Sequence, residues 1–165
     1  MSANQPHPPS LDVVYQEVKE RLDIQLHQVD TLDAKAGTVL SVASLVMTIA
    51  AGLQATVGRE DLHGWPLILL LAGALFYAFA MLFAFRGYWL RNFRRDPEPK
   101  PLRDLYLFQA PDFTKRRLTA NRIQSFELNS QLIESKVWNI KAAIILLAVQ
   151  TLTLVMALVL QRVGD

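Results

Sequence analysis

A cluster of basic residues in this sequence could bind a ligand. Arg116, Arg117 and Arg122 lie close together in one stretch of helical spacing. Clustered guanidinium groups hold phosphate through paired, charge-assisted hydrogen bonds. These three arginines are therefore our candidate ligand-binding residues. A charged helix face in contact with water is the commoner reason for such a run, and this alternative stays open.

A second group of polar residues precedes an uncharged stretch of the chain. Asp30 and Asp33 are three positions apart and would share one face of a helix, and Lys35 follows them. Lys136 and Asn139 precede another uncharged stretch in the same way. We predict a latch in which the aspartates accept hydrogen bonds from the second segment. The alternative is a charge cluster that only orders the entry of a helix into a membrane.

Catalytic chemistry has little support in the sequence. The chain has no cysteine, and its three histidines, His7, His27 and His63, are far apart. No thiol nucleophile or thiolate metal site is therefore available. The motifs of phosphate-binding loops, serine hydrolases, zinc proteases and dinucleotide-binding folds do not occur. We predict a protein that is not an enzyme and that uses neither a metal nor a resident cofactor.

The composition indicates a membrane protein. Of the 165 residues, 52% are hydrophobic and only 19% are charged, whereas globular domains average about 25% charged residues. The apolar residues are concentrated in three stretches, and about 20 apolar residues span a bilayer. We predict transmembrane helices at residues 36–57, 65–87 and 141–161, of which the first is the least apolar.

The distribution of lysine and arginine orients these three helices. Twelve of the seventeen basic residues lie in residues 86–141, and three precede residue 36. Three spans place fifteen basic residues on one side and two on the other, and the basic side is normally cytoplasmic. We expect a cytoplasmic N-terminus and a C-terminus outside. The basic and aromatic residues after the second span would contact membrane lipid rather than nucleic acid.

Two segments outside the spans have the spacing of coiled-coil helices. Residues 11–35 carry a seam at intervals of four and three positions, and residues 112–140 carry another. The second seam and its continuation into the span consist of Thr119, Ile123, Phe126, Ser130, Ile133, Val137, Ile140, Ile144 and Leu147. Each segment would form a cytoplasmic helix about 35–45 Å long that runs unbroken into a span.

The remaining segments connect these elements. Residues 1–10 are predicted to be a flexible N-terminus, and residues 88–111 a juxtamembrane linker. Within the linker we expect a proline-rich turn at residues 96–101. A short apolar piece at residues 102–108 would lie at the membrane interface or cap the cytoplasmic helices.

Small and polar residues form stripes within the predicted spans. Ser41, Ser44 and Thr48 lie at intervals of three and four in the first span, and Gln150 and Thr153 lie in the third. Small residues let membrane helices approach closely, and glutamine or threonine can bond across them. Packing within the chain is one explanation. The lining of a pore or of an oligomer contact is the other.

These elements define the predicted fold class. We expect an all-α integral membrane protein with three transmembrane helices, two of which extend into a cytoplasmic helical stalk. The seams and stripes favour a homo-oligomer.

Several short motifs resemble the Pycsar transmembrane effector family. They are Asp33-x-Lys35-Ala36 before the first span, the segment Tyr106–Phe108, and Asn129-x-Gln131 with Lys136 ahead of the last span. The resemblance extends from about Leu22 to Leu160. It implies a bacterial anti-phage effector in the cell inner membrane. With the orientation expected from the basic residues, the protein would be multi-pass with its C-terminus in the periplasm.

The resemblance also implies a signal and an outcome. A cyclic pyrimidine nucleotide, cyclic CMP or cyclic UMP, would activate the effector, which would then impair the membrane. Because the chain has no separate nucleotide-binding fold, such a ligand would bind the helical stalk, at Arg116, Arg117 or Arg122. The alternative is a membrane adaptor or scaffold that recruits a cytoplasmic partner through the coiled-coil-like stalk.

Overall fold

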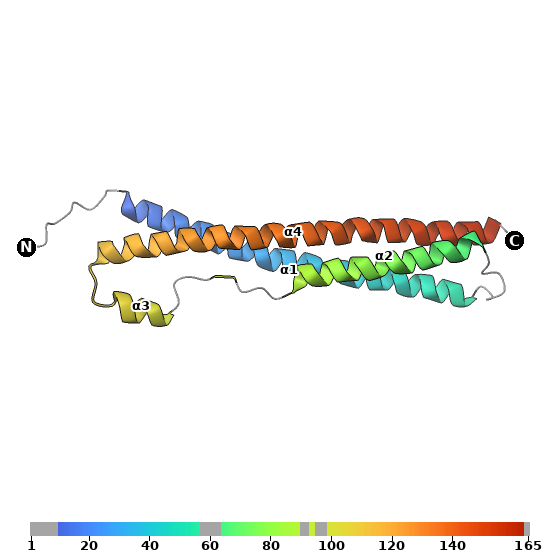
Figure 1. The fold of residues 1–165 in the computed structure, drawn as a ribbon, viewed down its shortest axis with the longest axis horizontal. Helices are drawn as coiled ribbons and strands as arrows, with labels where there is room; N and C mark the ends of the chain where they lie inside the picture. Colours follow the sequence, from blue (N-terminus) through green and yellow to red (C-terminus); the bar gives the residue numbers. More distant parts are fainter. Residues whose placement is uncertain (1–9, 57–63, 90–92, 95–98, 164–165) are drawn as a thin grey trace, which may run out of the picture. The chain divides into compact units, whose positions relative to one another are not determined.

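The computed structural model describes residues 10–56, 64–89, 93–94 and 99–163. Every regular element in these ranges is a helix, and three of the helices are long and apolar enough to cross a membrane, which confirms the predicted all-α membrane fold with three spans. The helices are α1 (Leu11–Thr56), α2 (Trp65–Tyr88), α3 (Pro99–Tyr106) and α4 (Pro111–Val163) (Figure 1).

The contacts divide the chain into two units. The membrane unit comprises residues 31–90 and 135–165, and the polar unit comprises the rest. Helices α1 and α4 each contribute to both units because neither helix is interrupted. The two units are described separately below.

Three helices share one core in the membrane unit. Val39 of α1, Ala84 of α2 and Ala143 of α4 form a buried cluster. The side chains of Leu40 and Phe83 pack against it. Because alanine has a short side chain, the three backbones approach closely at this level.

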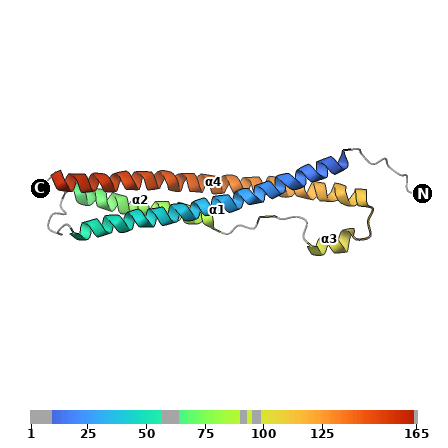
Figure 2. The same cartoon turned by 180° about the vertical axis from the view of Figure 1, so that it is seen from behind.

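The contacts also fix the helix directions in the membrane unit. Gln54 of α1 bonds to Gln161 of α4, and Asp33 bonds to Lys136, so α1 and α4 are parallel. Helix α2 lies beside them, as seen from behind in Figure 2. It runs antiparallel to α4, because Gly73 in the first half of α2 faces Leu154, whereas Gly87 near the end of α2 faces Ile140.

Glycine makes the contact between α2 and α4 possible. A Cβ atom at Gly73 would lie 2.7 Å from Leu154 Cδ2, and one at Gly87 would lie 3.1 Å from Ile140 Cγ1. A larger side chain would therefore push the helices apart. The buried small residues of α2, Gly73, Ala80, Ala84 and Gly87, thus form a packing surface within the chain.

The stripe of α1 has a different environment. Ser41 and Thr48 are exposed and Ser44 is half-buried. Each of the three hydroxyl groups donates to the carbonyl four residues earlier in α1, at 2.8–3.0 Å. Ser41 and Thr48 therefore lie outside the buried contacts of α1. Ala36, Ala43 and Ala50 make the close contacts of α1 instead.

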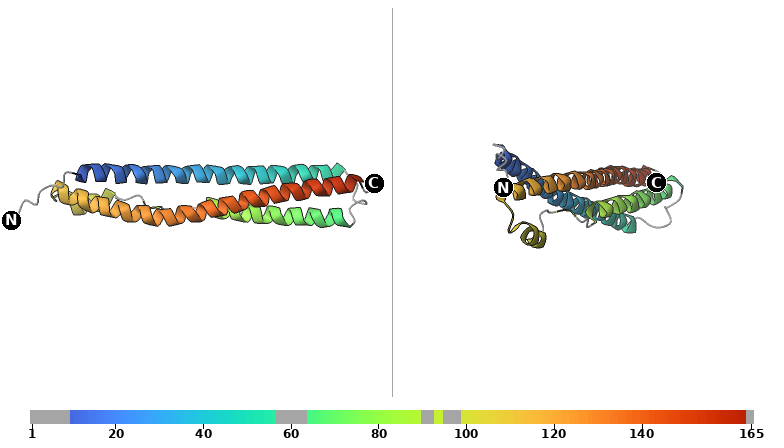
Figure 3. Two further views of the ribbon diagram at one scale, coloured as in Figure 1. Left: turned by 90° about the horizontal axis from the view of Figure 1, so that it is seen from above. Right: turned by 60° about the vertical axis from the view of Figure 1, so that its left-hand side comes forward.

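The polar unit is built on a parallel pair of helix segments, residues 11–30 of α1 and 111–134 of α4. Lys115 Nζ donates to Asp12 Oδ1 at 2.6 Å, and this hydrogen bond raises the pKa of Lys115. Leu11, Leu22 and Val29 are buried, as the predicted seam of α1 requires. The left-hand view of Figure 3 shows the blue start of α1 beside the orange start of α4.

The predicted seam of α4 is displaced by one position. Ile123 and Ile144 are 43% and 48% exposed. Thr119 and Ile140 of the predicted seam are buried. The residues buried one position before the predicted seam are Leu118, Arg122, Ser125, Asn129, Lys136, Asn139 and Ala143. The prediction assumed an apolar seam, whereas polar side chains occupy the inner face of α4 and find partners there.

The linker also differs from the prediction. Helix α3 begins at Pro99, inside the segment for which a turn was expected, because proline suits the first turn of a helix. Residues 96–98 lie outside the described ranges. Leu105, Leu107 and Phe108 are 63%, 65% and 94% exposed. Leu105, Leu107 and Phe108 are therefore not buried against the polar unit.

Candidate functional site

Two residues of the predicted latch are in contact in the membrane unit. Lys136 Nζ donates to Asp33 Oδ1 between α4 and α1. The Lys136 side chain is 1% exposed and that of Asp33 is 32% exposed. A buried ammonium is stable only when a carboxylate and further polar groups replace water. The ion pair therefore holds α1 and α4 together at this level.

The other predicted latch residues do not take part in this ion pair. Asn139 is buried, and its amide donates to Ser135 O of its own helix at 2.8 Å. Lys35 is exposed. Asp30 is exposed and belongs to the polar unit.

The three candidate arginines have different environments in the polar unit. Arg122 is 8% exposed, and its guanidinium lies 4.6 Å from the centre of the Tyr15 ring. Among the described residues, its buried Nη1 has no hydrogen-bond acceptor. Arg116 and Arg117 are exposed, and Arg117 lies over the ring of Phe113 at 5.7 Å. Arg122 is thus the only one of the three placed between α1 and α4.

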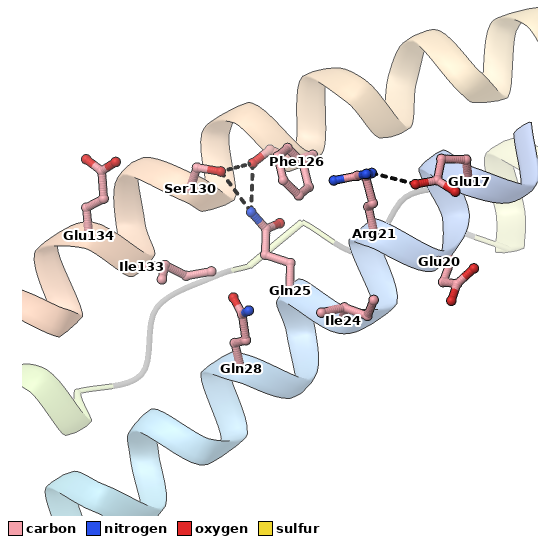
Figure 4. A pocket seen from close by; sticks show the side chains of 10 residues that line it. All are labelled: Glu17, Glu20, Arg21, Ile24, Gln25, Gln28, Phe126, Ser130, Ile133 and Glu134. Atoms are coloured by element: carbon pink, nitrogen blue, oxygen red, sulfur yellow. Dashed lines mark hydrogen bonds and ion pairs between the residues drawn. The ribbon is translucent and has the colours of Figure 1, made fainter. Parts of the chain in front are cut away.

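A buried glutamine lies on the same interface between α1 and α4. Gln25 is 4% exposed, and its Nε2 donates to Phe126 O at 3.0 Å and to Ser130 Oγ at 2.9 Å (Figure 4). Its buried Oε1 has no donor within the described part of the chain. The interface of the polar unit thus holds an unused donor on Arg122 and an unused acceptor on Gln25.

Asn129 clamps the segment that follows α2. It is fully buried; its Oδ1 accepts from Arg94 N and its Nδ2 donates to Arg94 O, both at 3.0 Å. The side-chain amide therefore pairs with one residue of the backbone as a strand would. This fixes residue 94 against α4 in the polar unit.

We expect Asn129→Asp to release this clamp. An aspartate keeps the acceptor for Arg94 N, but it cannot donate to Arg94 O when ionised, and its charge would be buried. The variant should unfold several degrees below the wild type in detergent and be cleaved faster by protease near residue 94. Ser125→Ala, at another fully buried polar position of the same helix, is the matched control. Equal protease resistance in both variants would contradict the clamp.

The third span carries a fully buried amide without partners. Gln150 is 0% exposed, and within the described ranges neither its Nε2 nor its Oε1 has a hydrogen bond. A polar group buried in this way costs free energy, and in a membrane water is not at hand to satisfy it. Among the described residues of the membrane unit, Gln150 therefore has both amide atoms buried without a hydrogen bond.

Two further glutamines lie nearer the ends of the same helices. Gln54 Nε2 donates to Gln161 Oε1 at 3.1 Å, while Gln54 Oε1 and Gln161 Nε2 have no partner among the described residues. Thr153, predicted beside Gln150, is half-buried and donates to Val149 O of its own helix at 2.7 Å. The structure does not place Ser41 and Thr48 in this interior, because both are exposed.

Sequence reasoning missed Gln25, Asn129 and the Gln54–Gln161 pair as polar contacts between segments. The signal that was available is their register. Gln25 occupies a position of the α1 seam, and Asn129 precedes the assumed α4 seam by one position. A polar residue inside a heptad seam marks a specific interhelical contact.

These features define a class of protein. The chain is an all-α membrane protein with a polar helix pair, a buried ion pair between α1 and α4, and a buried polar residue in its third span. The profile of the Pycsar effector protein domain, PycTM, matches residues 17–161, most of the chain. The chain therefore belongs to this family of membrane-associated defence effectors. No curated protein and no solved structure matches it.

Proposed function

We propose that this effector impairs the inner membrane when a cyclic pyrimidine nucleotide acts on its polar unit, which lies in the cytoplasm. The action is physical and non-enzymatic. The membrane helices rearrange, and no substrate is converted. The family supports a role in membrane-associated defence, and the observation that carries the rearrangement is Gln150.

The lack of hydrogen bonds to the buried amide of Gln150 favours a second arrangement of the membrane helices. In the described arrangement its amide is buried and makes no hydrogen bond with the described residues. An arrangement in which water or a neighbouring copy reaches the amide would recover that free energy. A signal then needs to supply only the difference between two arrangements. Water at Gln150 would also be the first step toward a leak through the membrane.

The nucleotide would bind between α1 and α4 of the polar unit. The unused donor of Arg122 suits a phosphate oxygen, and the unused acceptor of Gln25 suits an N–H of a pyrimidine base. Both atoms are buried, so the two helix segments must part for the ligand to enter. Because α1 and α4 continue into the membrane unit, such parting would turn their membrane portions as well.

The test is membrane potential and dye entry in bacteria that express the chain, with and without an added cyclic pyrimidine nucleotide. We expect depolarisation only with the nucleotide. Arg122→Gln should abolish the response. Arg103→Gln, which removes an exposed arginine paired with Asp104, should retain it.

The other outcomes are equally informative. Depolarisation without nucleotide would keep the membrane impairment and overturn the nucleotide signal. An intact membrane in both conditions, at confirmed expression, would overturn the proposal. It would favour an adaptor that recruits a partner, for which the exposed Phe108 offers a contact surface.

A further inference from the structure

A pocket lies between α2 and α4 in the membrane unit, near the end of α2. Its volume is about 270 Å³, below the roughly 300–1,000 Å³ usual for sites that enclose a whole small molecule. The described residues that line it are Leu82, Phe83, Arg86, Ser135, Trp138 and Asn139. Arg86 supplies the only charge among them.

The contacts between the two helices fix the order of these residues along the pocket. Gly87 of α2 faces Ile140 of α4, and the helices are antiparallel. Arg86 is therefore level with residue 141 of α4. Leu82 lies about 6 Å from that level in one direction along the helix axis, and Trp138 lies about 4–5 Å from it in the other. The pocket thus runs from apolar side chains, past the arginine, to polar groups.

Two exposed tryptophans mark the membrane surface at the polar end of the pocket. Trp89 of α2 and Trp138 of α4 are 59% and 69% exposed, and the same register places them at one level. Indole side chains prefer the boundary between the hydrocarbon and the headgroups. The polar end of the pocket therefore lies among lipid headgroups, on the cytoplasmic side in the expected orientation, and the apolar end lies in the hydrocarbon.

Arg86 carries a guanidinium group that the described residues do not neutralise. It is exposed and makes no ion pair with them. It lies about one turn inside the level of the tryptophans, and a long arginine side chain extends from such a position toward the headgroups. There it reaches the level of Trp138, whose indole N–H is a hydrogen-bond donor. A phosphate oxygen accepts hydrogen bonds from both kinds of group.

We propose that this pocket binds an anionic phospholipid, with the phosphate between Arg86 and Trp138 and the start of an acyl chain along Leu82 and Phe83. The order of the pocket, from apolar to cationic to polar, matches the order of acyl chain, phosphate and headgroup in such a lipid. A free phosphate would leave the apolar end unused. The bound lipid would contact both α2 and α4 and so hold them together at this end.

This inference does not rest on the nucleotide signal. The nucleotide is proposed to bind the polar unit, whereas every described residue that lines this pocket belongs to the membrane unit. The site also differs from the general attraction of a basic segment for lipid, because that attraction requires no particular arginine. Lipid binding can therefore be measured in protein that has never met a nucleotide.

Thermal unfolding of the full-length protein in a neutral detergent tests the site. We expect added phosphatidylglycerol to raise the melting temperature by several degrees. Diacylglycerol, which lacks the phosphate, and inorganic phosphate, which lacks the acyl chains, should have little effect. Arg86→Gln should need about five-fold more phosphatidylglycerol for the same rise, the change expected for the loss of one cation beside an anionic lipid.

Lys141→Gln is the matched control. Lys141 is an exposed cation at the level of Arg86, but it does not line the pocket. This variant should respond to phosphatidylglycerol as the wild type does. Equal responses of the two variants, whether weakened or not, would mean that Arg86 has no special part and would overturn the site. An equal rise with diacylglycerol or inorganic phosphate, or no rise with any of the three, would overturn it as well.

Tryptophan fluorescence provides a second measurement that leaves Arg86 in place. One variant keeps only Trp138, and a matched variant keeps only Trp65, which is 73% exposed at the start of α2; phenylalanine replaces the other tryptophans. Each is placed in phosphatidylcholine vesicles in which a tenth of the lipid is brominated near the start of the acyl chains.

Brominated phosphatidylglycerol should quench Trp138 about two-fold more than brominated phosphatidylcholine does, because the pocket enriches the anionic lipid. Trp65 should be quenched equally by both. Equal quenching of Trp138 by the two lipids would overturn the proposal, as would the same preference at Trp65. Membrane depolarisation plays no part in either measurement, so the proposed function stands or falls separately.

Discussion

Asp33→Ala is expected to destabilise this protein more than Lys136→Met, although the two residues form one ion pair. Removing Asp33 leaves an ammonium that is 1% exposed without its carboxylate, whereas removing Lys136 leaves a carboxylate that is 32% exposed and can take up water. Leaving a buried charge without its ion-pair partner costs about 3–5 kcal/mol. We expect a fall of that order for Asp33→Ala and a markedly smaller one for Lys136→Met.

Thermal unfolding in detergent, followed by the loss of the monodisperse peak, would measure this asymmetry. The double variant Asp33→Ala with Lys136→Met should regain much of the stability lost by Asp33→Ala, because no buried charge remains. Lys35→Met, at an exposed lysine of the same region, controls for the loss of a positive charge. Equal destabilisation by both single variants would show that burial of the ammonium is not what makes the loss of Asp33 costly.

The sequence predicted the fold class because its signals were strong and redundant. The three long uncharged stretches agree with the helices observed. So do the absence of a helix-breaking residue before the first and third stretches and the buried seam of α1. The register of α4 was less predictable. Its inner face is formed by Arg122, Ser125 and Asn129. Hydrophobic periodicity cannot locate a face whose residues are polar and satisfied by contacts distant in sequence.

The candidate site was predicted in the same uneven way. The Asp33–Lys136 pair was within reach of sequence reasoning, because both residues precede an apolar stretch at matching positions. The clamp from Asn129 was not, because its partner is the backbone of Arg94, and a backbone partner leaves no trace in residue types. The grouping of Arg116 and Arg117 with Arg122 overlooked how far a helix turns between neighbouring positions.

Gln150→Leu is expected to make the protein more stable and less active. Leucine has nearly the volume of glutamine, and it removes two amide atoms that are buried without partners among the described residues. A buried unsatisfied polar group costs about 1–3 kcal/mol. We therefore expect the melting temperature in detergent to rise by several degrees, and the nucleotide-dependent loss of membrane potential to fall at least ten-fold.

Gln161→Leu is the matched control for this prediction. It is the same change in the same helix, but Gln161 accepts a hydrogen bond from Gln54. Removing the Gln161 amide leaves the Gln54 donor without this acceptor, so we expect no gain in stability. A Gln150→Leu variant less stable than the wild type would show that the amide is satisfied in the resting protein. A variant that is more stable and fully active would exclude Gln150 from the membrane rearrangement. If Gln150→Leu raises stability and lowers activity, the unsatisfied amide of Gln150 destabilises the resting arrangement. It thereby lowers the free energy that a signal must supply to reach the active arrangement.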